Sequence, residues 1–402
     1  MNHLSYLEKL LEGIEVVWFP IREVTERTTN IKWRETSKSH QYIDLTSVSI
    51  DTKKIIETTE VGSSNAPSRA QKLVKRDDVL FATTRPTQMR YCLIDEEYDG
   101  AVASTGYCVL RVKKEVTLPK WILHLISSSD FKKYLEENQS GSAYPAISDA
   151  KVKDFSIPIP CPNNPEKSLE IQAEIVRILD AFTAMTAELT AELTAELNMR
   201  KKQYNYYRDQ LLSFDEGAVE WKSLGELADN LDSKRKPITS GQRVPGDIPY
   251  YGASGIVDYV KDFIFDGDFL LVSEDGANLL ARNTPIAFSI SGKNWVNNHA
   301  HVLKFETYAE RRYVEYYLNS IDLTPYISGA AQPKLNKKNL NSISIPNPSL
   351  EEKERIVSIL DKFYTLTSSI SDGLPREIEL RQKQYGYYRE LLLSFPKQEV
   401  VA

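Results

Sequence analysis

Two stretches of the 402-residue chain, residues 168–214 and 350–395, have apolar residues at the heptad-like spacing of long helices. Prolines cluster before each stretch, and Ser168 and Ser349 are the predicted N-caps. A helix over 169–214 would be about 70 Å long at roughly 1.5 Å per residue. Because its apolar stripe needs a partner, we expect it to pair with the second helix in an antiparallel arrangement.

Outside these stretches the pattern changes to short β-type runs separated by turn residues. Residues 78–82 and 101–112 are apolar in the manner of strands, and residues 120–138 return to helical spacing. Residues 269–273 form a similar β-type run with glycine-containing turns on both sides. Both blocks therefore predict compact, mixed and strand-rich domains.

The two helical stretches are copies of each other. Positions 200–214 read RKKQYNYYRDQLLSF and positions 381–395 read RQKQYGYYRELLLSF, with eleven of the fifteen residues identical. Positions 175–182 (IVRILDAF) match positions 356–363 (IVSILDKF) in six of eight residues, at the same offset of 181. Two matches at one spacing indicate an internal duplication.

The likeness between the two halves continues more weakly outside the helices, in three short segments. Positions 16–18 (VVW), 140–145 (SGSAYP) and 156–160 (SIPIP) resemble positions 219–221 (VEW), 328–333 (SGAAQP) and 344–348 (SIPNP). The blocks between these segments, roughly 25–120 and 228–312, show little likeness. A shared frame with divergent filling predicts one scaffold that reads two different things.

The two helical copies differ in one mechanical respect. Residues 186–197 read TAELTAELTAEL, which is either simple helical low-complexity sequence or a spacer whose length changes in whole units of about 6 Å. The second copy has no such array, and Gly373 and Pro375 predict a break in it. The expected spacer residues are Thr186, Leu189, Thr190, Leu193, Thr194 and Leu197.

Composition narrows the class of protein. Apolar residues make up 41% of the chain and charged residues 26%, as in globular proteins. No window approaches the ~18–20 apolar residues of a membrane span, and the N-terminus is too polar for a signal peptide, so we expect a cytoplasmic protein. Cys92, Cys108 and Cys161 form no CxxC pair, which argues against a disulfide framework or a zinc site. The net charge of −6 argues mildly against a nucleic-acid binder, although a neutral domain can still present a basic face.

Motifs that would make this chain an enzyme by itself are missing from the sequence. It has no GxxxxGK[ST] phosphate-binding loop, no GxGxxG, and no Asn/Asp-Pro-Pro-aromatic motif of an amino-methyltransferase. His299 and His301 could be two metal ligands, but we expect a structural or DNA-facing role for them. We therefore expect no catalytic residue, no bound metal and no cofactor on this chain.

The chain resembles the specificity subunits of type I restriction–modification enzymes over nearly its whole length. The resemblance rests on the duplicated segments ending in LLSF, the two IV(R/S)ILD(A/K)F segments, and the TAEL array, which is similar to that of the type IC subfamily. Residues 249–255 (PYYGASG) and 265–268 (FDGD) also resemble that family's domains. The resemblance implies an α+β fold: two globular mixed α/β target recognition domains, separated by two long antiparallel coiled-coil helices, in a pseudo-two-fold internal repeat.

This organisation predicts five segments along the chain, in which the two recognition domains alternate with the two helices and a tail follows. They are recognition domain 1 (1–160), the central helix with its spacer (165–214), recognition domain 2 (215–348), the C-terminal helix (349–395) and a tail (396–402). An alternative from another class stays open at this point. The chain could be a coiled-coil scaffold that presents two protein- or ligand-binding domains.

The resemblance also implies a function, which is to give sequence specificity to partner subunits. Each domain would read one half of a split target in double-stranded DNA, and the helices would set the gap, one TAEL unit spanning one to two base pairs of ~3.4 Å. Two modification (M) subunits would methylate adenine with S-adenosylmethionine. Restriction (R) subunits would use ATP and Mg²⁺ for translocation and cleavage. No membrane is implied.

The candidate DNA contacts are basic and amide side chains, because Arg and Lys bind guanine and phosphate whereas Asn and Gln bind adenine. In the first domain they are Arg34, Lys38, Arg69, Lys72, Arg85, Gln88 and Arg90. In the second they are Lys234, Arg235, Lys236, Arg243, Arg282, Lys293, Asn297, Asn298, Lys334, Lys337 and Lys338. Each could also be an ordinary exposed polar residue. The tyrosines near the helix ends are expected partly to pack between the helices and partly to form a surface for M subunits.

Overall fold

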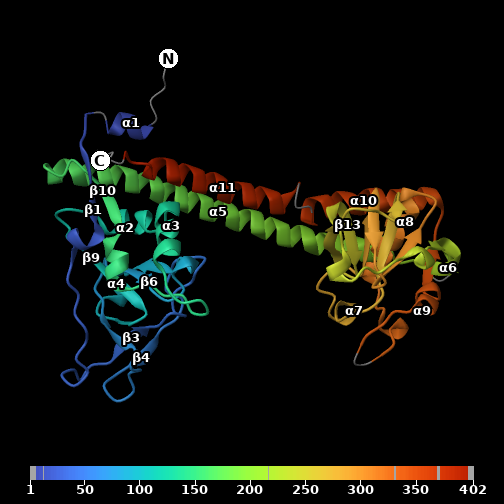
Figure 1. Cartoon of the computed structure of the whole chain (residues 1–402), viewed down its shortest axis with the longest axis horizontal. Helices are drawn as coiled ribbons and strands as arrows, with labels where there is room; N and C mark the ends of the chain where they lie inside the picture. The colour runs from blue at the N-terminus through green and yellow to red at the C-terminus, as the bar shows by residue number, and fades with distance from the viewer. Residues whose placement is uncertain (1–5, 12, 216, 330–331, 369–371, 397–402) are drawn as a thin grey trace. The chain divides into compact units, whose positions relative to one another are not determined.

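The computed structural model describes residues 6–11, 13–215, 217–329, 332–368 and 372–396 (Figure 1). The chain forms two compact units, which we call unit 1 (residues 1–191 and 379–402) and unit 2 (residues 192–378). None of the helices in the described ranges is long and apolar enough to cross a membrane. The five segment boundaries expected from the sequence remain a prediction, and most of the expected tail lies outside the described residues.

Unit 1 is a mixed domain of short strands and helices. Its strands are β1 (Val16–Pro20), β2 (Thr25–Glu26), β3 (His40–Ile43), β4 (Thr59–Val61), β5 (Ala70–Leu73), β6 (Val79–Ala82), β7 (Tyr91–Leu93), β8 (Val102–Ser104), β9 (Tyr107–Val112) and β10 (Ser156–Pro160). They form sheets in the orders β2-β9-β6-β7, β4-β3-β8-β5 and β1-β10. The helices are α1 (Tyr6–Leu10), α2 (Pro119–Leu125), α3 (Ser129–Asn138) and α4 (Asp149–Asp154).

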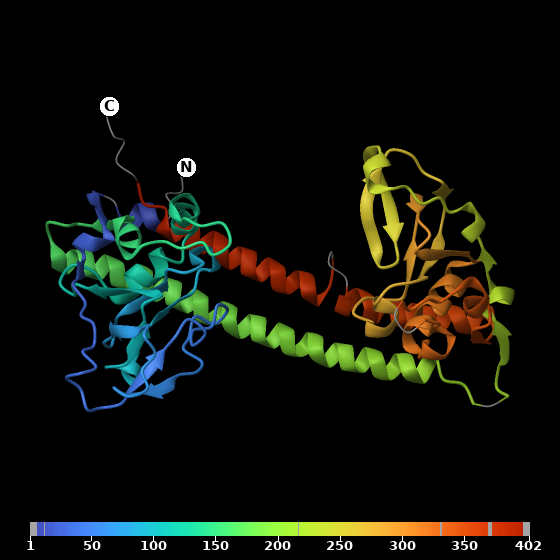
Figure 2. The same ribbon diagram turned by 60° about the horizontal axis from the view of Figure 1, so that its bottom comes forward.

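Unit 2 repeats this topology strand for strand. Its strands are β11 (Glu220–Ser223), β12 (Asp229–Asn230), β13 (Pro245–Gly252), β14 (Gly255–Val260), β15 (Phe265–Asp266), β16 (Phe269–Ser273), β17 (Ala287–Ile290), β18 (Lys293–Val296), β19 (Ala300–Lys304) and β20 (Ser344–Asn347). Their sheet orders are β12-β19-β16-β17, β14-β13-β18-β15 and β11-β20, and Figure 2 shows β13 and β14 as a hairpin. The helices are α6 (Leu224–Leu227), α7 (Asn278–Ala281), α8 (Tyr308–Ser320) and α9 (Lys337–Asn341).

Each strand of unit 2 thus takes the place of the strand numbered ten lower in unit 1, including the parallel pairs β3–β8 and β13–β18. The duplication therefore extends through the blocks whose sequences show little likeness. Topology depends on where apolar runs and turns fall, and cores tolerate extensive substitution when this pattern is kept. The frame persisted while side chains diverged.

The central strands β6 and β16 are buried on both faces. Because successive side chains point to opposite faces, each strand supplies two hydrophobic clusters. Phe81 packs with the helices, its ring 5.1 Å from that of Phe131, whereas Leu80 lies in the cluster against the other sheet. In β16, Leu270 and Leu271 divide between two clusters in the same way.

The first long helix, α5 (Pro165–Leu211), is continuous over 47 residues. It begins earlier than expected, because Asn164 accepts a hydrogen bond from the Lys167 amide (3.2 Å) and Pro165 occupies the first helical position, where its missing N–H costs nothing. The prediction that Ser168 is the N-cap is wrong: its side chain is buried inside the first turns and accepts a hydrogen bond from Gln172.

The second helical region consists of α10 (Leu350–Ser368) and α11 (Leu374–Leu393). The prediction that Ser349 caps its start is confirmed by a hydrogen bond from the Glu352 amide to the Ser349 hydroxyl (3.3 Å). The predicted break is also confirmed. Gly373 has a φ of 90°, and a side chain there would meet the carbonyl oxygens of the preceding helical turn.

In unit 1 the start of α5 packs antiparallel to α11. The rings of Phe182 and Tyr388 stack with centroids 5.8 Å apart. One residue further along α5, the hydroxyl of Thr183 lies 2.8 Å from that of Tyr385, which is earlier on α11. The two helices therefore run in opposite directions at this contact.

Unit 2 contains the reciprocal contact. Tyr207 of α5 stacks on Phe363 of α10, with centroids 5.6 Å apart. Since Tyr207 and Tyr388 occupy the same position of the repeat, as do Phe363 and Phe182, the two contacts are the same pair with the helices exchanged. The expectation that some tyrosines near the helix ends pack between the helices is confirmed.

Each domain also binds its own long helix through an aspartate of the ILD sequence. In unit 1, Asp180 of α5 accepts hydrogen bonds from Lys120 Nζ (2.6 Å) and His124 Nε2 (2.9 Å), both on α2. Burial lowers the pKa of His124, and its hydrogen bond to Asp180 only partly opposes this effect.

In unit 2 the equivalent aspartate, Asp361 of α10, binds α8. It accepts hydrogen bonds from the hydroxyls of Tyr308 (2.7 Å) and Tyr316 (2.6 Å) and from the Arg312 guanidinium (2.8 Å). Burial alone would raise the pKa of Asp361, but these donors outweigh it and the pKa is lowered. The same position of the repeat thus holds each domain, through different partners.

Candidate nucleic-acid interface

Three loops meet at one corner in unit 1, which we call corner 1. They are the segment after β6 (83–88), the β8–β9 turn (105–106) and the loop 140–147. Main-chain hydrogen bonds join them: the Thr83 amide donates to the Gly106 carbonyl (2.8 Å), and the Ile147 amide to the Thr83 carbonyl (2.9 Å). The Arg85 amide donates to the Pro145 carbonyl (2.7 Å). The backbone of corner 1 is therefore fixed.

The equivalent loops of unit 2 form corner 2 with the same hydrogen bonds. They are residues 274–278, the β18–β19 turn (297–299), and residues 328–329 and 332–335. The Glu274 amide donates to the His299 carbonyl (2.8 Å), and the Leu335 amide to the Glu274 carbonyl (2.8 Å). The Gly276 amide donates to the Pro333 carbonyl (3.3 Å). The repeated SG(S/A)A–P sequence therefore supplies a corner loop in each unit.

The loops that leave β6 and β16 contain strained backbone. Arg85 and Met89 of unit 1 and Arg282 of unit 2 have φ values of 49°, 53° and 50°, in the left-handed region that side chains other than glycine rarely adopt. Such conformations cost roughly 1–3 kcal/mol each and concentrate at functional sites. The strained residues therefore mark these two loops as candidate functional segments.

Corner 1 presents a basic side chain on an aromatic ring. The Arg85 guanidinium lies 5.3 Å from the ring centroid of Tyr144, which is 72% exposed. Arg85 and Gln88 are themselves exposed. Stacking on a ring restricts the guanidinium and leaves its edge N–H groups to bind another molecule.

Corner 2 presents a histidine held by a carboxylate. His299 is exposed, and its Nδ1 lies 2.9 Å from each carboxylate oxygen of Asp275. The buried Asn297 accepts a hydrogen bond from the His299 amide (2.8 Å) and fixes the turn. Asn298, next to it, is exposed. The two corners thus share a backbone but differ in chemistry.

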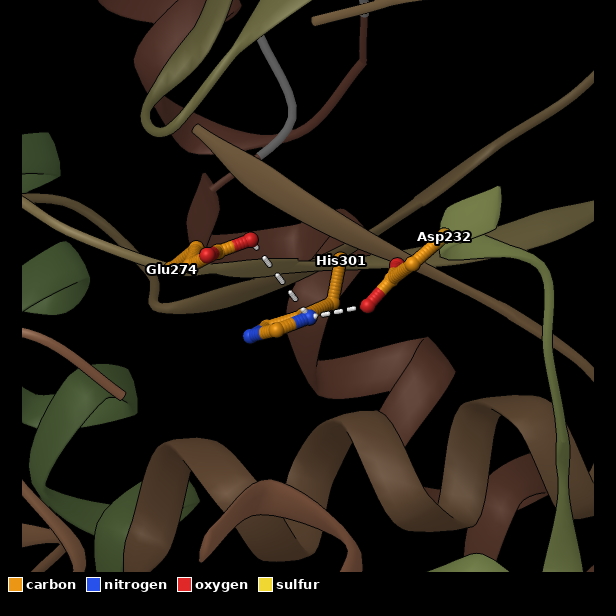
Figure 3. A group of neighbouring side chains, drawn as sticks. All are labelled: Asp232, Glu274 and His301. Carbon is orange, nitrogen blue, oxygen red and sulfur yellow. Dashed lines mark hydrogen bonds and ion pairs between the residues drawn. The ribbon is translucent and has the colours of Figure 1, made fainter. Parts of the chain in front are cut away.

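Behind corner 2 lies a buried group of Asp232, Glu274 and His301 (Figure 3). His301 Nδ1 lies 2.6 Å from Asp232 Oδ2, and His301 Nε2 lies 2.7 Å from the Leu335 carbonyl oxygen. Both ring nitrogens are therefore engaged by acceptors of the protein in this arrangement, so neither faces an open position for a metal ion.

The carboxylates of this group are paired with cations. Glu274 lies 2.6 Å from the Arg235 guanidinium and 3.2 Å from Lys334 Nζ. Burial alone would raise the pKa of Asp232 and of Glu274, but hydrogen bonds from His301 and Arg235 respectively outweigh it and both pKa values are lowered. The group is an ion-pair network, and through Leu335 and Lys334 it holds one loop of corner 2.

Corner 1 is supported differently: Lys72 donates to the Tyr107 carbonyl, as Arg235 does to the equivalent Ala300 carbonyl, and pairs with Asp149, but uncharged residues replace Glu274 and His301. Thr83 occupies the position of Glu274, and Cys108 the position of His301, as the strand registers show. Burial raises the pKa of Cys108 to about 12, so its thiol stays neutral. The two corners therefore differ in what supports them as well as in what they expose.

Several of the DNA-contact candidates from the sequence use their charged groups within the fold. Lys72 Nζ lies 2.5 Å from Asp149, Arg90 donates to two main-chain carbonyls, and Arg235 is in the ion-pair network. Arg243 lies over the Tyr250 ring, and Lys293 over that of Phe263. One nitrogen of Arg282 is buried without a hydrogen-bond partner.

The structure brings only some of the candidates together. Arg85 and Gln88 lie at corner 1, and Asn297, Asn298 and Lys334 at corner 2. The remaining candidates are exposed and lie outside the corners: Arg34, Lys38, Arg69, Lys234, Lys236, Lys337 and Lys338. Sequence reasoning missed Tyr144 and Asp275, although the repeated SG(S/A)A–P loop contains Tyr144 and could have pointed to it.

Comparisons with known proteins agree on one family. The family model "Type I restriction modification DNA specificity domain" matches residues 21–199 and 218–380. The chain is 38% identical to the EcoR124I/EcoR124II specificity subunit of Escherichia coli, over 100% of both chains. It is 35% identical to the EcoprrI specificity subunit of Escherichia coli, over 92% of this chain and 93% of that one.

Two solved structures share the fold. A chain from "Structural basis underlying complex assembly and conformational transition of the type I R-M system" has a TM-score of 0.71 at 21% identity, covering 94% of this chain and 97% of that one. The HsdS subunit from Thermoanaerobacter tengcongensis has a TM-score of 0.56 at 24% identity, covering 94% and 95%. The alternative of an unrelated coiled-coil scaffold finds no support in these comparisons.

Proposed function

The chain belongs to the type I restriction–modification DNA specificity family. We propose that it recognises the DNA target sequence at which partner subunits methylate adenine and direct restriction. Each unit reads one half of a bipartite target in double-stranded DNA. The observation that carries this proposal is the repetition of one topology with different exposed side chains at equivalent corners. One scaffold used twice with different surface chemistry suits a target whose halves differ.

Two M subunits bind the chain in this proposal, one to each copy of the repeat. Exposed tyrosines support it. Tyr206 is 62% exposed beside Tyr207, and Tyr387, the same position of the repeat, is 65% exposed beside Tyr388. Two equivalent aromatic surfaces suit two copies of one partner, since tyrosine is enriched at protein interfaces.

The chemistry belongs to the partners. M subunits use S-adenosylmethionine, R subunits use ATP and Mg²⁺, and the complex acts in the cytoplasm. This chain contributes recognition and, through the TAEL array of α5, the gap between the two half-sites, as in the type IC subfamily. Leu189, Leu193 and Leu197 of the array are half-buried, which suits helix pairing.

The adenine methylation pattern of cells that express the chain with its M subunits tests the proposal. We expect one split motif with a fixed gap and adenine methylated in both halves. Methylation at unrelated sites, or at a continuous motif, would contradict it.

Deleting residues 194–197, one TAEL unit, tests the spacer. The helix becomes about 6 Å shorter, so the gap in the methylated motif should shorten by one to two base pairs. Both half-site sequences should stay the same, because the deletion touches neither domain. A changed half-site sequence would refute the role of the array as a spacer.

A further inference from the structure

The two corners are the parts of each unit where fixed backbone and divergent exposed side chains coincide. We propose that they read the bases, with Arg85 binding a guanine of the first half-site and His299 accepting a hydrogen bond from an adenine or cytosine amino group of the second. This inference rests on the proposed function and assigns it to particular atoms.

The positions of Arg85 and His299 on a fixed backbone suit base reading. Base reading requires side chains held within a fraction of an ångström, on a backbone that does not shift when they change. At both corners, equivalent main-chain hydrogen bonds join the same three loops. Exposed Arg85 of corner 1 stands where corner 2 has Gly276, and exposed His299 of corner 2 stands where corner 1 has Gly106. Each corner therefore extends a side chain from a different one of its loops.

Arg85 has the chemistry to bind guanine. Guanine presents two acceptors, O6 and N7, in the major groove, and the forked N–H groups of arginine match both. The exposed Tyr144 ring 5.3 Å away limits the positions of the guanidinium, so less freedom is lost when the contact forms. Its strained φ of 49° indicates that the loop is held in a costly conformation that presents this residue.

His299 has the opposite chemistry. When the ring is neutral, its Nδ1–H donates to Asp275, and Nε2 is left with a lone pair. A lone pair accepts hydrogen bonds from the amino groups of adenine or cytosine and does not bind the major-groove oxygens of guanine or thymine. Asp275 is therefore a positioning residue, because in the neutral ring it selects the tautomer whose Nε2 can accept.

The ion-pair network supports this assignment by fixing the neighbouring loop. His301 binds the Leu335 carbonyl, and Glu274 pairs with Lys334 at the end of the same loop. The ion pair with Glu274 keeps Lys334 next to the loop that contains Asp275, the residue that follows Glu274. We assign Lys334 to phosphate contact, which adds affinity and sets register without selecting a base.

The experiment compares methylomes of Arg85→Ala, His299→Ala and His299→Asn in the full chain, expressed with the M subunits. Lys54→Ala and Lys261→Ala serve as controls and should leave the methylated motif unchanged, since both residues are exposed, lie outside the corners and are not candidate DNA contacts. We expect Arg85→Ala to lose discrimination about ten-fold or more at one guanine position of one half-site only. His299→Ala should do the same at one adenine or cytosine position of the other half-site.

Further variants separate reading from folding. His299→Asn keeps an acceptor and should retain part of the preference, and Asp275→Asn should relax the same base position as His299→Ala, by less. If a variant methylates nothing, competition binding with duplexes substituted at each base pair replaces the methylome. A preference lost at one pair supports the inference, and an unchanged profile overturns it.

The inference and the proposed function fail in different ways. A wild-type chain that methylates no bipartite motif would refute the proposed function. A wild-type bipartite motif that stays identical in Arg85→Ala and His299→Ala would overturn the inference alone. Relaxation in both half-sites by a single variant would also overturn it, since each corner belongs to one unit.

Discussion

Asp180 and Asp361 occupy the same position of the repeat, yet the domain helices that they bind offer different chemistry. Asp180 takes a lysine and a histidine from α2, whereas Asp361 takes two tyrosine hydroxyls and an arginine from α8. A carboxylate accepts from any of these donors. The comparison shows how domains can diverge while they stay attached to an unchanged helix.

The largest expected effect is on Asp361. In Asp361→Ala the Arg312 guanidinium, 10% exposed, keeps Glu315 but loses Asp361, and the Tyr308 and Tyr316 hydroxyls lose their acceptor, so we expect unit 2 to lose about 3 kcal/mol of stability. Asp180→Ala should cost less, about 1–2 kcal/mol, because Lys120 is 48% exposed and water replaces its partner, while the buried His124 loses one hydrogen bond. Urea unfolding of the full chain, with hydrogen exchange of α8 and α2, measures both. Equal losses would contradict the comparison.

A smaller and symmetrical effect is expected from the stacked rings. Tyr207→Ala and Tyr388→Ala each remove the stacked pair between the helices, worth about 1 kcal/mol beyond the area that it buries, together with an equivalent contact to the neighbouring Tyr206 or Tyr387. Because the two pairs are the same contact with the helices exchanged, the two losses should agree. Lys202→Ala, at an exposed position of α5, is the control and should change stability little. Unequal losses of stability in urea unfolding would contradict the prediction that the two equivalent contacts contribute equally.

The smallest expected effect is a pH dependence of stability that the contact of Asp180 with α2 has and the contact of Asp361 with α8 lacks. Burial keeps the pKa of His124 below its ordinary value of 6.5, so the unfolded chain takes up a proton more readily than the folded one. Stability from this site is present above about pH 6.5 and is lost as the pH falls through the lowered value. Arg312 stays charged throughout that range.

Hydrogen exchange of α2 and α8 between pH 7.5 and 5.5, corrected for the intrinsic rate, measures this difference. The α2 segment should lose protection on acidification while α8 keeps it. In His124→Gln, which keeps a donor for Asp180 but does not titrate, the pH dependence of α2 should disappear. If the pH dependence of α2 remains in His124→Gln, the titration of His124 is not its cause.

The sequence predicted the helices, the break and the duplication well, because these depend on spacing and identity along one chain. Periodic apolar residues located α5 and α10, and Gly373 located the break. The Ser168 cap was misplaced, because serine also fits inside a helix when its hydroxyl finds a partner such as Gln172. The prediction of one scaffold used twice rested on the short shared segments alone, because topology is set by apolar patterning and leaves few identical residues in the blocks between them.

The candidate site was harder to predict for a different reason. The sequence alone does not distinguish the basic residues Lys72, Arg85 and Arg90. The fold shows that Lys72 and Arg90 bind groups within unit 1, whereas Arg85 is exposed. Likewise, one of the two neighbouring histidines is buried in an ion-pair network and the other is exposed. His301 lies within β19, whereas His299 lies in the turn before that strand, and no motif in the sequence distinguishes them.

The central claim is that each unit reads its own half of the target. Replacing residues 224–343 by residues 21–155 tests it most directly. The boundaries are equivalent, because the amide of Ile21 binds the carbonyl of Phe155 as that of Leu224 binds that of Ile343. The methylome of this chain with its M subunits should show a symmetric motif, with the first half-site repeated in inverted orientation and the wild-type gap. A motif that retains the second half-site would contradict the claim.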